Sequence, residues 1–212
     1  MTERLSSITG FVLAGGASRR MGRDKASLAW GNETLLTRQI RLLGAVCRSV
    51  MVVGAVEGSN GQGVRAVKDF IPGCGPLGGI YTGLLQTRTE YNLFLGCDTP
   101  FITPRFMRFL VEHALQSKSD VTVMQLPNGR LQPLCGVYRR RAATGIGLRL
   151  KVGNYKTGAY CHHARCRIIS WGDVAGAGFR PNLFANLNTP EEYEAAQKNT
   201  GPAVSCWGSP KG

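Results

Sequence analysis

Short apolar runs alternate with helix-like patterns along most of this 212-residue chain, and this alternation restricts the folds open to it. Runs typical of buried strands cover residues 8–14, 50–53, 64–67 and 91–95. Apolar residues at helical spacing cover 34–47 and 77–87, and Thr103 followed by Pro104 marks the start of another helix. Buried strands that alternate with helices form a mostly parallel sheet covered on both faces. The chain is therefore predicted to be an α/β protein.

The second half of the chain carries weaker signals. Residues 120–124 and 134–138 are further strand candidates, while 151–180 is less regular. Thr189 and Glu192 have the spacing of a capping box at the start of a last helix. Because no repeat and no linker divides the chain, we expect one domain over 1–198, followed by a flexible Gly/Pro/Ser-rich tail over 199–212.

Composition favours a cytoplasmic protein. No apolar run approaches the roughly 20 residues that cross a bilayer, and the stretch 8–14 is too short for a secretory signal. The seven cysteines are odd in number and show no paired framework. The cluster from Cys161 to Cys166 lacks the close Cys-x2-Cys step of zinc sites, so a thiol-bearing loop or strand end is the favoured interpretation.

Positive charge is concentrated in one part of the sequence. The formal charge is +13, and no acidic residue lies between Asp120 and Asp173, a segment that holds nine arginines and lysines. A field of one sign attracts anions, so nucleic acid, phosphorylated small molecules and an acidic protein are all candidate partners. A solubilising basic face is the alternative.

A glycine-rich segment, residues 13–25, directly follows the first predicted strand. Ligands of parallel sheets bind outside the carboxyl ends of the strands. Gly15 and Gly16 allow close approach of the backbone to phosphate oxygens, and Arg19 and Lys25 supply positive charge. The segment matches neither G-x-G-x-x-G nor the P-loop. We expect an anion-binding loop rather than an ordinary glycine-rich turn.

Three further segments carry candidate site residues. Asp98 follows the strand 91–95 and is either a magnesium (Mg2+) anchor or the cap of a turn. Residues 69–79 include six glycines and prolines that lie beside a ligand or start the next helix. Asn186 and Asn188 share one face of a strand-like run before the last helix.

These four segments, in this order, resemble the molybdenum cofactor guanylyltransferase (MobA-type) family of the nucleotidyltransferase superfamily. The similarity runs from about residue 9 to residue 194, with residues 13–25, 75–79, 97–100 and 188–192 as its distinctive parts. It implies a Rossmann-like three-layer sandwich with a mostly parallel central sheet. It also implies a magnesium-dependent enzyme that transfers GMP from GTP to molybdopterin and releases pyrophosphate.

The resemblance also implies roles for individual residues. Lys25, Arg19 and Asp98 would be catalytic, and Asp98 would also hold the metal. Asn186 and Asn188 would lie on the substrate side. The implied nucleotide-binding residues are Leu13, Ala14, Gly15, Gly16, Lys25, Asp69 and Asp98. GTP and molybdopterin would be the small-molecule partners, and an acidic protein that supplies or receives the cofactor is a further expectation.

One departure and three alternatives bear on this assignment. An asparagine that the family often has after the second strand is missing, since the chain reads Val52-Val53-Gly54-Ala55 there. A related enzyme that uses CTP or a sugar phosphate is the first alternative, although Gly15 and the segment 75–79 resemble the guanine-specific family. A basic nucleic-acid-binding protein is the second, which the missing recognition helix and aromatic platform disfavour. A nucleotide-binding protein without turnover is the third.

Overall fold

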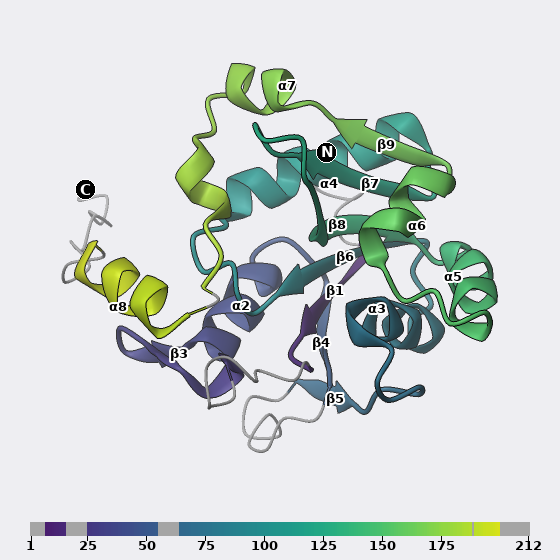
Figure 1. Ribbon diagram of the computed structural model, residues 1–212, viewed down its shortest axis with the longest axis horizontal. Coiled ribbons are helices and arrows are strands. Elements are labelled where there is room, and N and C mark those ends of the chain that lie inside the picture. Colours follow the sequence, from purple (N-terminus) through teal and green to yellow (C-terminus); the bar gives the residue numbers. More distant parts are fainter. Residues whose placement is uncertain (1–6, 16–24, 55–63, 188, 200–212) are drawn as a thin grey trace, which may run out of the picture.

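The computed structural model describes residues 7–15, 25–54, 64–187 and 189–199, and its centre is a seven-stranded sheet (Figure 1). The strands are β1 (Ile8–Leu13), β4 (Ser49–Val53), β5 (Arg65–Val67), β6 (Tyr91–Gly96), β7 (Val121–Gln125), β8 (Leu131–Arg139) and β9 (Cys166–Ile169). Their order is β5-β4-β1-β6-β8-β7-β9. β8 runs antiparallel to β6 and β7, and all other pairs are parallel. The predicted mostly parallel sheet is thus confirmed.

Helices cover both faces of this sheet (Figure 1). They are α2 (Leu35–Gly44), α3 (Gly75–Gln86), α4 (Pro104–Ser117), α5 (Ala142–Lys151), α6 (Thr157–His163), α7 (Trp171–Gly176) and α8 (Pro190–Asn199). Short 3-10 turns, η1 (Lys25–Ser27) and η3 (Pro181–Phe184), and a small hairpin of β2 (Ala29–Trp30) and β3 (Glu33–Thr34) complete the described part. One buried cluster joins the sheet to α2 and α4, and another joins it to α3, α5 and α6. This arrangement is the three-layer sandwich that the sequence predicted.

The central strand β1 shows why the sheet needs both helical layers. All its residues are buried. Ile8 and Val12 point into the α2/α4 cluster, whereas Phe11 and Leu13 point into the α3/α5/α6 cluster. Since successive side chains of a strand alternate between faces, a continuous apolar run requires apolar cover on both sides.

The predicted helix starts are confirmed by their hydrogen bonds. The Thr103 hydroxyl accepts the Phe106 N–H at 3.3 Å and caps α4. Thr189 and Glu192 form the reciprocal capping box at the start of α8, with both bonds 3.2 Å long. α8 then packs on the β2/β3 hairpin through a small cluster that includes Trp30 and Ala196. The C-terminal helix is therefore fixed to a hairpin near the N-terminus.

The structure differs from the sequence prediction mainly between residues 142 and 180. α6, β9 and α7 occupy the part that looked irregular, and α5 was not predicted at all. Gly145 and Gly147 weaken the helical signal of α5. A Cβ atom at Gly145 would lie 3.0 Å from the Tyr160 hydroxyl, and one at Gly147 would lie 3.1 Å from the Tyr81 ring. These glycines allow α5 to pack closely between α3 and α6. Tertiary packing therefore stabilises α5 as a helix in spite of its weak local helical signal.

No helix within the described ranges is long and apolar enough to span a bilayer. The assignment of residues 1–198 to one domain stays a prediction, and the predicted tail lies almost entirely outside the described residues.

Gly83 of α3 provides a test of the packing between α3 and the sheet. A Cβ there would lie 2.8 Å from the ring of Phe94, which stacks on Phe11 with ring centroids 4.8 Å apart. We expect Gly83→Val to lower the free energy of unfolding by about 1–3 kcal/mol, because the rings cannot move apart without disturbing the core. Urea unfolding measures this change. The matched variant Gly44→Val, at a helical glycine with nothing within 4 Å, should change it by less than about 0.5 kcal/mol. Equal stability of the two variants would contradict the packing argument.

Candidate active site

The carboxyl ends of the central parallel strands meet at one edge of the sheet. Leu13 at the end of β1 pairs with Val53 on one side and with Gly96 on the other, and Val53 pairs in turn with Val67. The segments that follow these strands are therefore neighbours. Gly15, Gly54, Asp69 and Asp98 all belong to them. The sequence placed its candidate site at this edge, and the strand register brings the parts together there.

The glycine-rich segment leaves β1 in direct contact with the segment after β4. The Ala14 N–H donates to the Val53 carbonyl at 2.9 Å. Gly54 has φ = +120°, and a Cβ on it would lie 2.3 Å from the Gly15 nitrogen. No side chain fits into this approach, so Gly54 has to be glycine. The sequence prediction noted Gly54 only as a departure from the family, although a glycine directly after a buried strand was a signal for such a contact.

Asp69 lies against Gly15. A Cβ on Gly15 would be 3.2 Å from Asp69 Oδ2, and one on Gly79 would be 3.6 Å from Asp69 Oδ1. Oδ1 is buried and has no hydrogen-bond partner among the described residues. Burial raises the pKa of the Asp69 carboxyl above its usual value. A buried carboxylate oxygen without a donor is costly, so a ligand that donates to it would be favoured here.

Residues 75–79 form the first turns of α3 rather than a loop. The helix begins at Gly75, with Pro76 in its first turn, two residues before the predicted start. The Phe70 N–H donates to the Thr82 hydroxyl at 3.0 Å and ties the segment after Asp69 to the helix. The absence of a Cβ at Gly79 lets α3 approach both Leu13 and Asp69. Of the two interpretations that the sequence left open for this segment, helix start is confirmed.

Asp98 lies in a rigid turn after β6. Its carbonyl accepts the Leu187 N–H at 2.8 Å, while Gln39 of α2 donates to the Thr99 carbonyl at 3.0 Å. Arg38 donates to the Pro100 carbonyl at 2.7 Å. Side chains of α2 and the segment before α8 thus hold the backbone of this turn in place.

The Asp98 carboxylate folds back over the end of β6. A Cβ on Gly96 would lie 2.7 Å from Asp98 Oδ1, so glycine is needed beneath it. Burial raises the pKa of the Asp98 carboxyl, and the charge of Lys25 together with a backbone hydrogen bond opposes that rise. The two charged groups that the sequence singled out are therefore close enough to interact electrostatically, although they lie far apart in sequence.

A small cavity lies next to the segment that is hydrogen-bonded to Asp98. It has a volume of about 210 Å3 and is lined by Leu126, Arg130, Leu131, Gln132, Phe184, Asn186 and Glu192. Asn186 Oδ1 is buried without a hydrogen-bond partner in the described part of the chain. Leu187, the next residue, donates to Asp98. The sequence named Asn186 but not the cavity, because its lining comes from the turn before β8 and from the segment before α8.

The remaining predictions have different outcomes. Arg19, Gly16 and Asn188 lie outside the described residues. The cluster from Cys161 to Cys166 spans the end of α6 and the start of β9, and no group of three metal-binding side chains occurs in the ranges that the structure describes. The basic segment does not form one surface, because Arg130 lines the small cavity whereas Arg140 lies at the opposite edge of the sheet.

The sequence is similar to those of known proteins. The model of the MobA-like NTP transferase domain family matches residues 10–157. A probable molybdenum cofactor guanylyltransferase of Pelotomaculum thermopropionicum is 34% identical over 191 residues, which are 89% of this chain and 91% of that protein. A molybdenum cofactor guanylyltransferase of Desulfosudis oleivorans is 31% identical over 197 residues, which are 91% of this chain and 96% of that protein.

A solved structure extends the comparison to the fold. The molybdopterin-guanine dinucleotide biosynthesis protein A of Archaeoglobus fulgidus superposes with a TM-score of 0.78 over 90% of this chain and 97% of its own, at 18% identity. This likeness concerns the fold, whereas the family model and the two relatives concern the sequence. The chain belongs to the MobA-like NTP transferase family, and within it to the molybdenum cofactor guanylyltransferases that its sequence resembles.

Proposed function

We propose that this protein transfers GMP from GTP to the terminal phosphate of molybdopterin, in the cytoplasm, and releases pyrophosphate. The observation that carries the proposal is the position of Asp98, within reach of the Lys25 charge, at the edge of the sheet where Gly15 meets Gly54. A nucleoside triphosphate needs backbone donors, a cation and a metal-binding carboxylate in one place. The names of the two relatives supply the choice of guanine and of molybdopterin.

The nucleotide is expected to lie along the glycine segment. Gly15 is exposed, so the backbone after β1 is open to a ligand. The close contact with Gly54 restricts the position of the Gly15 backbone. Asp69 lies beside this backbone through Oδ2, and its Oδ1 has no donor among the described residues, so Oδ1 would accept a hydrogen bond from the nucleoside. These features support Leu13, Ala14, Gly15 and Asp69 as nucleotide-binding residues.

The residues present fit magnesium. The ion prefers oxygen ligands, usually takes one or two protein carboxylates, and completes its shell with water and phosphate oxygens. Asp98 supplies such a carboxylate in a turn held from three sides, without a cluster of ligands that would suit zinc among the described residues. When bound, magnesium would neutralise phosphate charge and hold the reacting phosphates together.

The acceptor would occupy the small cavity beside Asp98. Arg130 offers a guanidinium to a phosphate, and Asn186 and Gln132 offer amides to a polar ring system. Asn186 Oδ1, which has no partner among the residues that the structure describes, would accept from an N–H donor of such a ring. An acceptor in this cavity would lie near the Asp98 turn, because Leu187, the residue after Asn186, is hydrogen-bonded to the Asp98 carbonyl.

The chemistry then requires little beyond placement and charge. An oxygen of the acceptor phosphate attacks the α-phosphorus of GTP, a new P–O bond forms, and the bond to the bridging oxygen of pyrophosphate breaks. The attacking oxygen is already ionised, so no general base is needed. Lys25, with Arg19 of the same segment, would balance the charge of the leaving pyrophosphate. Both reactants are anions, and this screening is the main contribution expected of the protein.

Pyrophosphate release tests the proposal directly. We expect release from GTP that depends on molybdopterin and on magnesium, and little release from CTP or UTP. Heat stability should rise with GTP and magnesium, because a ligand that binds only the folded state stabilises it. Release from CTP in preference to GTP would identify a cytidylyltransferase of the same fold. Binding of GTP without any pyrophosphate release would contradict an enzymatic role.

Lys25 and Asp98 are predicted to act on turnover rather than on folding. Lys25→Ala and Asp98→Asn should each reduce kcat by at least about a hundredfold, the scale of losing one electrostatic contact to the reacting phosphates. Circular dichroism should show an unchanged fold. Lys156→Ala and Asp173→Asn remove the same charges at surface positions far from the site in sequence and should keep near-normal rates. Normal kcat values in both site variants would exclude this arrangement as the catalytic centre.

Asp69 is predicted to act mainly on nucleotide binding. Asp69→Asn keeps the shape of the side chain but replaces one acceptor with a donor, which would face the donors of the nucleoside. We expect the KM for GTP to rise by about tenfold or more, with a smaller change in kcat, since the lost contact is present before and during the reaction. Steady-state kinetics at saturating molybdopterin separate the two effects. An unchanged KM for GTP would remove Asp69 from the nucleotide site.

A further inference from the structure

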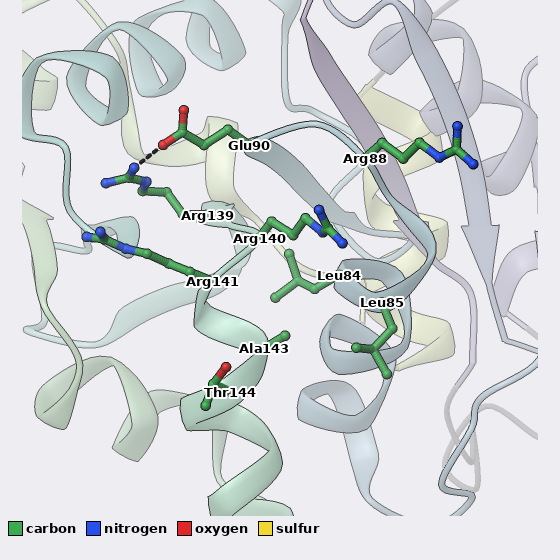
Figure 2. A pocket seen from close by; sticks show the side chains of 9 residues that line it. All are labelled: Leu84, Leu85, Arg88, Glu90, Arg139, Arg140, Arg141, Ala143 and Thr144. Carbon is green, nitrogen blue, oxygen red and sulfur yellow. Dashed lines mark hydrogen bonds and ion pairs between the residues drawn. The ribbon is translucent and has the colours of Figure 1, made fainter.

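A second, larger hollow lies at the opposite edge of the sheet from the candidate active site. Its volume is about 480 Å3, and its lining consists of Leu84, Leu85, Arg88, Glu90, Arg139, Arg140, Arg141, Ala143 and Thr144 (Figure 2). Arg88 and Glu90 precede β6, and Arg139 ends the antiparallel β8, so the hollow belongs to the amino ends of the parallel strands. The six-residue length of β6 separates it from Asp98 by about 20 Å. We call it the arginine hollow.

Four guanidinium groups line the arginine hollow against one carboxylate. Arg139 is held by Glu90, by the Lys118 carbonyl at 2.9 Å and by the face of the Tyr91 ring. Arg141 pairs with Asp120. The guanidinium groups of Arg88 and Arg140 form no hydrogen bond or ion pair within the described residues, so these two cations are open to a ligand. The Arg140 backbone N–H donates to the Glu90 carbonyl at 2.7 Å and leaves the side chain free.

The guanidinium groups form a row instead of converging on one point. Figure 2 shows Arg140 in the middle, Arg88 on one side, and Arg139 and Arg141 on the other. A single phosphate group would need its cations gathered around one position. A row of separated cations fits an extended chain with several negative charges.

The floor of the arginine hollow is apolar. Leu84 is completely buried, whereas the neighbouring Leu85 is 47% exposed beside the arginines. An exposed leucine between cations suits a ligand that also carries an apolar side chain. The lining contains no aromatic ring on which a base could stack. These features favour a protein segment over a nucleic acid.

We propose that the arginine hollow binds an acidic segment of a partner protein. Carboxylates of the segment pair with Arg88 and Arg140, and an apolar side chain between them packs on Leu85. Arg139 and Arg141, already fixed by their own partners, form the rigid wall beside them. Such a partner would leave the carboxyl edge of the sheet open, so the proposal does not depend on the identity of the reaction.

Fluorescence anisotropy with synthetic peptides tests the proposal on the full-length protein. The probe is a labelled peptide of alternating glutamate and leucine, compared with a lysine–leucine peptide and with a single-stranded thymidine oligonucleotide. The double variant Arg88→Glu, Arg140→Glu should bind the glutamate–leucine peptide at least about tenfold more weakly, because the charge of both open cations is reversed. The control variant, Lys156→Glu combined with Arg180→Glu, makes the same charge change at two exposed side chains outside the arginine hollow and should change the affinity by less than about twofold.

A second comparison separates the role of Leu85 from general attraction between charges. The unmodified protein should bind a glutamate–serine peptide more weakly than the glutamate–leucine peptide. The Leu85→Ser variant should bind the two peptides with equal affinity. Thermal unfolding checks that each variant stays folded. Equal weakening in the two charge-reversed variants, absence of peptide binding, or tighter binding of the oligonucleotide with the same dependence on Arg88 and Arg140 would overturn the proposal.

Discussion

The parallel pairing of β1 with β4 and β6 is the constraint on which the candidate active site depends. Leu13, Val53 and Gly96 lie side by side at the ends of these strands, so the segments after them leave the sheet together. A shift of the register by one residue would turn every buried side chain of β1 to the wrong face. The hydrophobic core therefore fixes the register, and the register in turn places Gly15, Gly54 and Asp98 together. Stability and site geometry share the same cause.

The carboxylates of the candidate site lower the stability of the folded state. Burial raises the pKa of both Asp69 and Asp98, which means that the folded protein disfavours their charged forms. Lys25 offsets part of this cost at Asp98, and Asp69 Oδ1 has no described partner at all. Carboxylates that the fold alone does not satisfy are expected where a ligand supplies the missing interactions. The unsatisfied groups thus mark the positions at which a nucleotide and a cation would contribute.

Features that depend on a few consecutive residues could be predicted from the sequence. The caps at Thr103 and Thr189, the alternation that gives the sheet, and the candidate residues after β1 and β6 all have local signals. Features that need contacts between distant segments could not. α5 is a helix in spite of two glycines, because those glycines allow contact with Tyr81 and Tyr160. The cavity at Asn186 joins the turn before β8 to the segment before α8, and nothing in either segment alone indicates the other.

The basic segment of the sequence shows how topology can divide a pattern that looks continuous. β8 is nine residues long and runs from the carboxyl edge to the amino edge of the sheet, antiparallel to β6 and β7. Arg130 therefore precedes the strand at the carboxyl edge, near Asp98, whereas Arg140 follows it at the amino edge, about 30 Å away. Any strand places the residues before and after it at opposite ends, and the reversed direction of β8 decides that Arg130, and not Arg140, lies at the carboxyl edge. The same run of arginines accordingly offers one cation to the candidate acceptor cavity and a row of cations to a separate surface, two environments that the net charge of the segment could not distinguish.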